Sequence, residues 1–270
     1  MFWPVMITIA LGSVLLSGTG YYTSKLGLST IAFGAAHAAL AGAAIAYVTN
    51  LNPTILSLAL ATLLGAILSI VARRASNELV NNVIMTAFSA FNALALLSIY
   101  LSNTVVLATV GVGALLWGSP LAVTPNRFLV IVALLATFFS YTSLFRLQLH
   151  SIIFDRRLAE AEGIRVDLFT LITLVFLCFS LAVMLEVVGG FMTFTLLYVP
   201  NALATTITSK ALIQLVTSSI YGLVASLLGA LLSFTLDLPI GATIALTISM
   251  LTLPIYAYKI LLQHLKNLKA

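Results

Sequence analysis

The sequence predicts an all-α fold, a polytopic bundle of transmembrane helices. Of its 270 residues, 61% are hydrophobic and only 7% are charged, whereas soluble domains are about 25% charged. Apolar stretches of about 20 residues recur along the chain, which is the length that crosses a hydrocarbon core of about 30 Å. No polar segment is long enough to fold alone. We therefore expect residues 1–270 to form one transmembrane permease domain in the lipid bilayer.

We expect about nine spans, within a range of about eight to ten, because each apolar stretch has the length of a membrane crossing. They cover residues 2–20, 28–48, 54–72, 82–101, 127–148, 167–185, 190–208, 211–234 and 241–261. The stretch 103–120 is apolar but short and glycine-rich, and prolines follow it. Because irregular backbone is tolerated at membrane depth only where protein covers it, we expect a re-entrant or interfacial segment there.

The basic residues predict the orientation in the membrane. If the N-terminus lies outside and 103–120 does not cross, every Lys and Arg except Arg127 falls on the inner side. Cytoplasmic loops of membrane proteins are enriched in these residues. We therefore expect a multi-pass protein of the cell membrane with its N-terminus outside and its C-terminus in the cytoplasm. The same enrichment accounts for the net charge of +5, so we expect no nucleic acid as a partner.

A charged segment, residues 155–167, separates two blocks of predicted spans. Residues 151–162 lack Pro and Gly, and Gly163 can end a helix, so we expect a cytoplasmic helix at about 151–165. Phe154, Leu158 and Ala161 would then share one face. The pattern fits a solvated loop helix, and it also fits an amphipathic helix that docks in a groove of a soluble partner.

His37 is the only ionisable residue well inside a predicted span, where a charged side chain is costly. Small residues surround it at intervals of four: Gly34, Ala38, Gly42 and Ala46. Such a face lets another helix approach closely. Two interpretations remain open: the imidazole lines a polar path, or it is a neutral side chain hydrogen-bonded to a neighbouring helix.

Further candidates lie around the seventh span. Glu186 is predicted near the outer surface, just before Gly189 and Gly190, as a carboxylate that attracts cations or as an ordinary interfacial residue. Pro200 removes a helical hydrogen bond and is expected to kink its span, either for packing or as a hinge.

The segment from Asp237 through Pro239 to Gly241 predicts a turn on the outer side, before the last span. Motifs of intrinsic chemistry are absent from the sequence: it has no Gly-x-x-x-x-Gly-Lys-Ser/Thr phosphate loop, no His-Glu-x-x-His, no Cys-x-x-Cys and no Gly-x-Ser-x-Gly. We therefore expect a transport protein rather than an enzyme, and one whose energy comes from a gradient or from a partner.

A series of short segments carries a resemblance. It comprises His37-Ala-Ala-Leu-Ala-Gly42, Gly118-Ser-Pro-Leu-Ala-Val123, the charged segment with Phe154 before it, Val187-Val-Gly189 with Pro200-Asn-Ala-Leu-Ala204, and Leu236-Asp-Leu-Pro-Ile-Gly-Ala-Thr243. Each segment is weak alone. In this order, across residues 20–255, they resemble the integral membrane permease subunits of ABC importers for divalent metals such as zinc, manganese or iron.

The resemblance implies an ATP-driven importer that moves a divalent cation, zinc before manganese or iron, by alternating access at a homodimer axis. It implies two cytoplasmic ABC ATPase subunits and an extracytoplasmic metal-binding protein as partners. The chain itself would bind no cofactor, since the metal is cargo and the partner binds ATP. His37 would line the path, with Glu186 as a lesser candidate. The residues expected to couple to the ATPase are Phe154, Asp155, Arg156, Arg157, Leu158, Ala159, Glu162 and Gly163.

One departure from the family concerns the cargo. The family usually has Asp four residues before the histidine, and this chain has Phe33, while Ala41 replaces a proline. Imidazole still suits zinc, but a hard cation such as manganese loses more without the carboxylate. The alternatives are therefore the same architecture with a diverged, non-metal substrate, or a secondary transporter without an ATPase. The order of the segments argues against the latter.

Overall fold

The computed structural model describes residues 2–104, 113–119 and 123–267, and every regular element within them is a helix. In chain order these are α1 (Phe2–Lys25), α2 (Ser29–Thr49), α3 (Pro53–Arg74), α4 (Asn77–Thr104), α5 (Ala114–Trp117), α6 (Pro125–Leu144), α7 (Arg146–Phe154), α8 (Arg156–Ala161), α9 (Val166–Ile207), α10 (Ala211–Leu236) and α11 (Ile240–Asn267). The predicted all-α membrane fold is confirmed, because eight of these helices are long and apolar enough to cross a bilayer.

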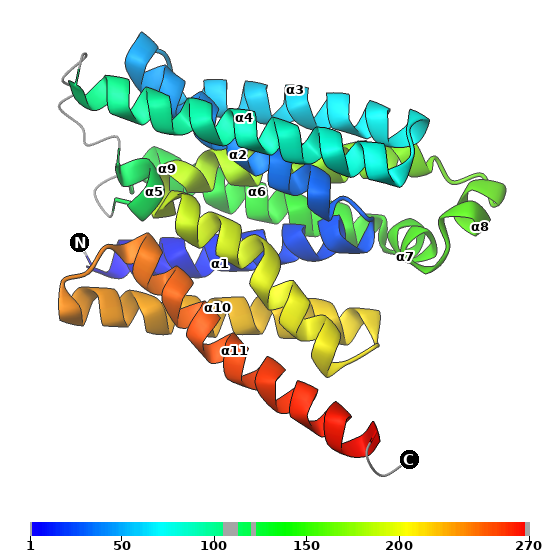
Figure 1. Ribbon diagram of the computed structural model, residues 1–270. Coiled ribbons are helices and arrows are strands. Elements are labelled where there is room, and N and C mark those ends of the chain that lie inside the picture. The colour runs from blue at the N-terminus through cyan, green and yellow to red at the C-terminus, as the bar shows by residue number, and fades with distance from the viewer. Residues whose placement is uncertain (1, 105–112, 120–122, 268–270) are drawn as a thin grey trace.

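Helix α9 accounts for the difference between eight helices and about nine predicted spans. It has 42 residues and would be about 63 Å long if straight, at 1.5 Å per residue, about twice the hydrocarbon core. At Gly189 the backbone leaves the helical region, with φ 80° and ψ 166°. The part before Gly189 and the part after it run in opposite directions (Figure 1). Helix α9 thus contains both predicted stretches, 167–185 and 190–208.

The two ends of the bundle are distinct. The N-terminus lies at one end, and the C-terminus lies at the other, together with α7 and α8 (Figure 1). We call these the N-terminal end and the C-terminal end. Helix α4 finishes and α6 begins at the N-terminal end (Figure 1), and most of the predicted re-entrant segment 103–120 falls between them. Residues 105–112 and 120–122 lie outside the described residues.

Local signals fix several helix boundaries. The Asn52 side chain accepts a hydrogen bond from the Ile55 N–H at 3.1 Å and caps α3, and Thr124 caps α6 in the same way, just before Pro125. The predicted span 127–148 runs too far, because the backbone at Phe145 is not helical and α7 starts at Arg146. Pro200 lies inside α9, but the break in α9 is at Gly189 rather than at the proline.

Helix α2 forms the centre of one half of the bundle, packed against α3, α4 and α9. Its small residues explain this position. A Cβ atom at Gly42 would lie 2.6 Å from the Leu56 carbonyl oxygen and 2.8 Å from the Ser57 Cα, so α3 approaches α2 at backbone distance. The Ser57 hydroxyl donates to the Ala39 carbonyl at 2.7 Å across the same contact. Gly34, by contrast, meets only side-chain ends, among them Leu68.

At the N-terminal end, three glycines allow three backbone segments to touch. A Cβ atom at Gly189 would lie 2.3 Å from the Gly118 nitrogen, and one at Gly241 would lie 2.4 Å from the Val188 carbonyl oxygen and 2.6 Å from that of Trp117. Gly118 faces Val188 equally closely. We call Gly118, Gly189 and Gly241 the glycine junction. It joins α5, the break in α9 and the start of α11.

Replacing Gly189 with alanine is expected to destabilise the protein by at least about 2 kcal/mol, because the backbone there has φ 80° and the added methyl group meets backbone atoms. Gly190→Ala is the matched control. Its Cβ atom would meet its nearest neighbour at 3.4 Å, an ordinary contact, so we expect a change within about 1 kcal/mol. Thermal unfolding of the purified variants measures both, and equal losses would contradict the special role of Gly189.

Candidate functional site

His37 lies in the middle of α2 and is only 8% exposed. Its Nδ1 atom is 3.0 Å from the carbonyl oxygen of Phe33, one turn earlier on the same helix. Because a carbonyl oxygen only accepts hydrogen bonds, Nδ1 carries the proton and Nε2 keeps the lone pair. The hydrogen bond is therefore within α2 and not to a neighbouring helix, and it leaves free the nitrogen that can bind a metal.

Aromatic rings from three helices surround this imidazole. Phe194 of α9 stacks on it, with the ring centroids 4.8 Å apart and an interplanar angle of 27°. Phe88 of α4 meets it edge-on at 4.4 Å, and Phe33 lies at 4.8 Å. We call His37, Phe33, Phe88 and Phe194 the aromatic cluster. Tyr198 extends it, with its ring 6.0 Å from that of Phe33.

The aromatic cluster surrounds an imidazole that bonds within α2, and not to a neighbouring helix as one of the two interpretations expected. It packs His37 firmly, and it holds an imidazole with one free nitrogen at the centre of a span. No carboxylate accompanies it, since Phe33 fills the position four residues earlier. Among the described residues, no group of three or more His, Cys, Asp and Glu side chains could hold a metal ion. A single copy of the chain therefore offers at most a partial ligand set.

Glu186 differs from its prediction as a carboxylate at the membrane surface. Its side chain is 2% exposed and forms an ion pair with Arg127 of α6. The hydroxyl of Thr54, in the first turn of α3, donates to its other oxygen. The carboxylate is thus buried between α3, α6 and α9 at the N-terminal end. Burial of a charge requires a partner and hydrogen bonds, and Glu186 has both.

Two short helices, α7 and α8, project from the C-terminal end (Figure 1), and the charged segment begins between them. The single helix predicted at about 151–165 is wrong, because Asp155 has an extended backbone. Its side chain accepts hydrogen bonds from the N–H groups of Arg157 at 2.8 Å and Leu158 at 3.1 Å. Asp155 thus ends α7 and caps α8. Phe154 and Leu158 belong to different helices and do not share a helical face.

Gly163 ends α8 as predicted. Its φ is 81°, its N–H donates to the Glu160 carbonyl, and the Ile164 N–H donates to the Ala159 carbonyl, both at 3.0 Å. This pair of bonds is the Schellman motif, which requires a left-handed residue and so favours glycine. The ends of α8 are therefore fixed on both sides by the sequence.

The two faces of this segment differ. Ala159 is buried with Leu149, Ile152 and Val166 in an apolar cluster, whereas Phe154 is 84% and Leu158 49% exposed. Arg156 ties α8 to α9, because its guanidinium contacts Asp167 at 2.9 Å and also Glu160 at 3.2 Å. The Ser151 hydroxyl donates to Glu162 at 2.9 Å. The segment is thus anchored to the bundle, and α7 and α8 together present Leu147, Phe154 and Leu158 outward.

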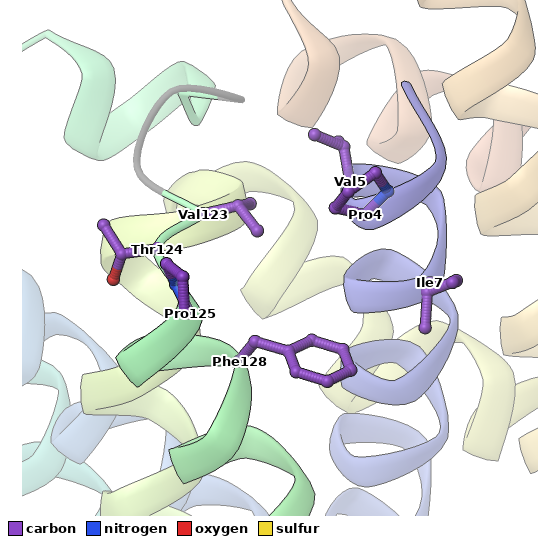
Figure 2. Close-up of a pocket in the computed structure, with 7 residues that line it drawn as sticks. All are labelled: Pro4, Val5, Ile7, Val123, Thr124, Pro125 and Phe128. Atoms are coloured by element: carbon purple, nitrogen blue, oxygen red, sulfur yellow. The ribbon is translucent and has the colours of Figure 1, made fainter. Parts of the chain in front are cut away.

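A cavity of about 420 Å³ lies elsewhere, between α1 and the start of α6. Pro4, Val5 and Ile7 line it from one side, and Val123, Thr124, Pro125 and Phe128 from the other (Figure 2). The Phe128 ring points across it toward α1 (Figure 2). None of these side chains carries a charge or an imidazole, so this cavity is no candidate for binding a cation.

The other residues that the sequence singled out lie in packing contacts between helices or in turns at helix ends. Ala38 is fully buried, and Gly190 lies beside Leu115 and Phe194. Asp237 adopts a left-handed backbone, with φ 54°, at the end of α10. The Pro239 carbonyl accepts from the Thr243 N–H at 3.0 Å and so helps to start α11. The segments that carry the resemblance at 118, 187–189 and 236–243 all meet at the glycine junction.

Comparisons with known proteins agree with this architecture. A family model described as the ABC 3 transport family matches residues 1–259. The manganese import system permease protein ScaB of Streptococcus parasanguinis is 24% identical over 245 residues, which is 90% of this chain and 85% of that protein. The probable iron transport system membrane protein of Haemophilus influenzae is 26% identical over 253 residues, 94% of this chain and 86% of that protein.

A solved structure shares the fold. In PsaBC from Streptococcus pneumoniae in complex with Fab, one chain superposes with a TM-score of 0.78 at 23% sequence identity, covering 93% of this chain and 89% of that chain. At this identity the match concerns the fold alone.

Replacing Asp155 with alanine is expected to loosen the start of α8 by about 1 kcal/mol, because two N–H groups lose their acceptor. Asp155→Asn is the control, since asparagine caps helices equally well. Hydrogen exchange at the amides of Arg157 and Leu158 measures the effect. We expect faster exchange in the alanine variant alone, and equal exchange in both variants would contradict the capping role.

Proposed function

This chain belongs to the ABC 3 transport family, and from that premise we propose that it is the membrane-spanning subunit of an ATP-driven importer for a divalent metal cation. The proposal draws on the relatives, whose names include manganese and iron transport. It also draws on the imidazole of His37, which keeps a free nitrogen inside a span. Imidazole without a carboxylate suits zinc better than manganese, so we place zinc first among the cargoes.

The observation that carries the proposal is the exposed surface of α7 and α8. Phe154 is 84%, Leu147 81% and Leu158 49% exposed on these two short helices, and several exposed apolar side chains among charged ones are typical of a site for a partner protein. The sequence has no phosphate loop of its own. We therefore assign this surface to a cytoplasmic ATPase subunit, one on each copy of the permease.

The orientation follows from the charges at the two ends of the bundle. The C-terminal end has Lys25, Arg74, Arg146 and the basic residues of the charged segment, whereas Arg127 at the N-terminal end is paired with Glu186. The positive-inside rule then puts the C-terminal end in the cytoplasm. An extracytoplasmic binding protein would deliver the cation at the N-terminal end.

A homodimer completes the ligand set in this proposal. One copy supplies a single imidazole and no cluster of metal-binding side chains among its described residues, so a second copy would bring a second imidazole to the shared axis. Because His37 is 8% exposed, its approach to the path requires the rings of the aromatic cluster to separate. The change between outward and inward access would provide that movement.

The aromatic cluster also supports a second candidate, the same importer architecture with a non-metal substrate. Phe33 stands where a metal-binding carboxylate would be, and it packs on His37 and Phe88. An apolar or aromatic substrate would be compatible with such a lining, and a cation would then have no role there.

Uptake assays test the function and the role of His37 together. Cells that lack the chain are expected to lose ATP-dependent uptake of zinc, manganese or iron, and the wild-type chain should restore it. His37→Phe keeps an aromatic ring but removes the free nitrogen, so we expect an assembled protein with uptake reduced at least about tenfold.

The outcomes of this assay separate the claims. Unchanged uptake of every divalent transition metal in the deleted strain would contradict metal transport. Normal uptake by an assembled His37→Phe protein would contradict only the ligand role. If the variant fails to assemble, His37 serves packing.

Truncation of Phe154 or Leu158 to alanine is expected to weaken docking of the ATPase subunit at least about tenfold, about 1.4 kcal/mol, because each removes an exposed apolar contact. Leu238→Ala is the matched control, since Leu238 is 48% exposed, against 49% for Leu158, but lies at the opposite end. Binding and metal-dependent ATP hydrolysis of the reconstituted complex measure the effect. Docking equal to that of the Leu238 variant would rule out this surface.

A further inference from the structure

The ion pair between Arg127 and Glu186 is unusual for its place in the chain. Arg127 is the only basic residue that the orientation assigns to the outer side, and its partner Glu186 is a buried carboxylate of α9. Thr54 donates to the second carboxylate oxygen. One carboxylate therefore joins the first turns of α3 and α6 to α9, one helical turn before the break at Gly189.

The two partners are buried to different degrees. The Arg127 side chain is 35% exposed, whereas that of Glu186 is 2% exposed. The guanidinium is therefore the more accessible member of the pair, and the carboxylate is enclosed on α9. Without Arg127, Glu186 would be a buried anion that keeps the Thr54 hydroxyl as a donor but has lost its charged partner, which is strongly unfavourable unless another cation takes the place of the arginine.

The position of this carboxylate relates it to the aromatic cluster. Tyr47, near the end of α2, lies within electrostatic range of both Glu186 and Arg127. His37 is on the same helix, about 15 Å closer to the C-terminal end at 1.5 Å per residue. Glu186 is thus nearer than His37 to the N-terminal end, the side from which we propose that the cation enters.

We propose that Glu186 is a transient binding site for the incoming divalent cation and that Arg127 occupies this site between transport events. In this exchange a hydrated divalent cation replaces the guanidinium at the carboxylate, so Glu186 keeps a cationic partner while the net charge of the contact rises by one. Carboxylate oxygens bind such cations readily. This inference rests on the proposed metal transport, and it adds an outer step of arginine-for-metal exchange that precedes any contact with His37.

The same exchange links the cargo to the conformation. While Arg127 is bound, the ion pair holds α6 against α9 and keeps the N-terminal end closed around the glycine junction. When a cation displaces Arg127, α6 loses its charged tie to α9, and the end is free to open. After the cation moves inward, Glu186 again needs a partner and the arginine returns.

Binding of Mn²⁺ to the purified full-length permease tests the exchange. Arg127→Gln is expected to lower the thermal midpoint without metal, because Glu186 loses its charged partner. It should also bind Mn²⁺ at least about tenfold more tightly than the wild-type chain, because the site is no longer occupied by the arginine. Added Mn²⁺ should then raise the thermal midpoint of Arg127→Gln.

The double variant R127Q/E186Q is expected to lose this gain in affinity and the thermal response to Mn²⁺. The matched control is Asp237→Asn, which removes the exposed carboxylate at the same end and should leave Mn²⁺ affinity at the wild-type value. If Arg127→Gln does not fold, Arg127→Lys serves instead. We expect its gain in Mn²⁺ affinity to be smaller than that of Arg127→Gln, because lysine is a weaker partner for the carboxylate than arginine but still occupies the site.

The exchange is overturned if Arg127→Gln, or Arg127→Lys in its place, binds Mn²⁺ no more tightly than R127Q/E186Q. It is also overturned if Asp237→Asn removes Mn²⁺ binding as fully as the double variant does. Uptake by the wild-type complex is a separate readout. Intact metal uptake without the gain in affinity rejects only the exchange, whereas a gain in affinity without uptake of any metal rejects the transport assignment.

Discussion

At Gly189 the chain of α9 turns back, and the space that a side chain would need is filled by the backbone of Trp117 and Gly118. The backbone there has a positive φ of 80°, a region to which glycine alone among the amino acids has free access. Helix α9 is therefore two antiparallel segments rather than one rod. The N- and C-terminal ends of the bundle, the position of α5 and the start of α11 all depend on this turn.

The first part of α9 connects the two ends of the molecule. Near its start, Asp167 contacts Arg156 of α8, and near its end, Glu186 contacts Arg127 of α6. A helix of this length moves as a stiff rod, since each residue is bonded to the next turn. A displacement of α8 by a docked partner would therefore reach the Arg127–Glu186 pair directly. The second part of α9 brings Phe194 onto His37, so the turn at Gly189 joins this rod to the aromatic cluster.

Much of the fold could be predicted from the sequence, because lipid allows few solutions. Apolar length predicted the spans, whereas the membrane orientation that the basic residues predict stays a prediction. Gly163 was predicted as the end of α8 because glycine accepts a left-handed backbone. Asp155 was missed as a cap because helix propensity continues across it, and only the local hydrogen bonds show the break. The aromatic cluster was beyond prediction, since Phe88 and Phe194 come from distant spans and no periodicity relates them to His37.

The position of Arg127 was a signal in the sequence for the ion pair with Glu186, and the sequence analysis did not use it. In the predicted topology Arg127 is the exception to the positive-inside pattern, and an isolated charge at the edge of a membrane must be hydrated or paired. Only two carboxylates, Glu186 and Asp237, fall on the same side of the predicted topology, and Asp237 lies in an exposed turn. Pairing of Arg127 with Glu186 was thus the natural hypothesis, although sequence could not show that the carboxylate is buried. That burial distinguishes the two partners. The arginine can reach water and the carboxylate cannot, so the arginine is the member of this contact that can be replaced.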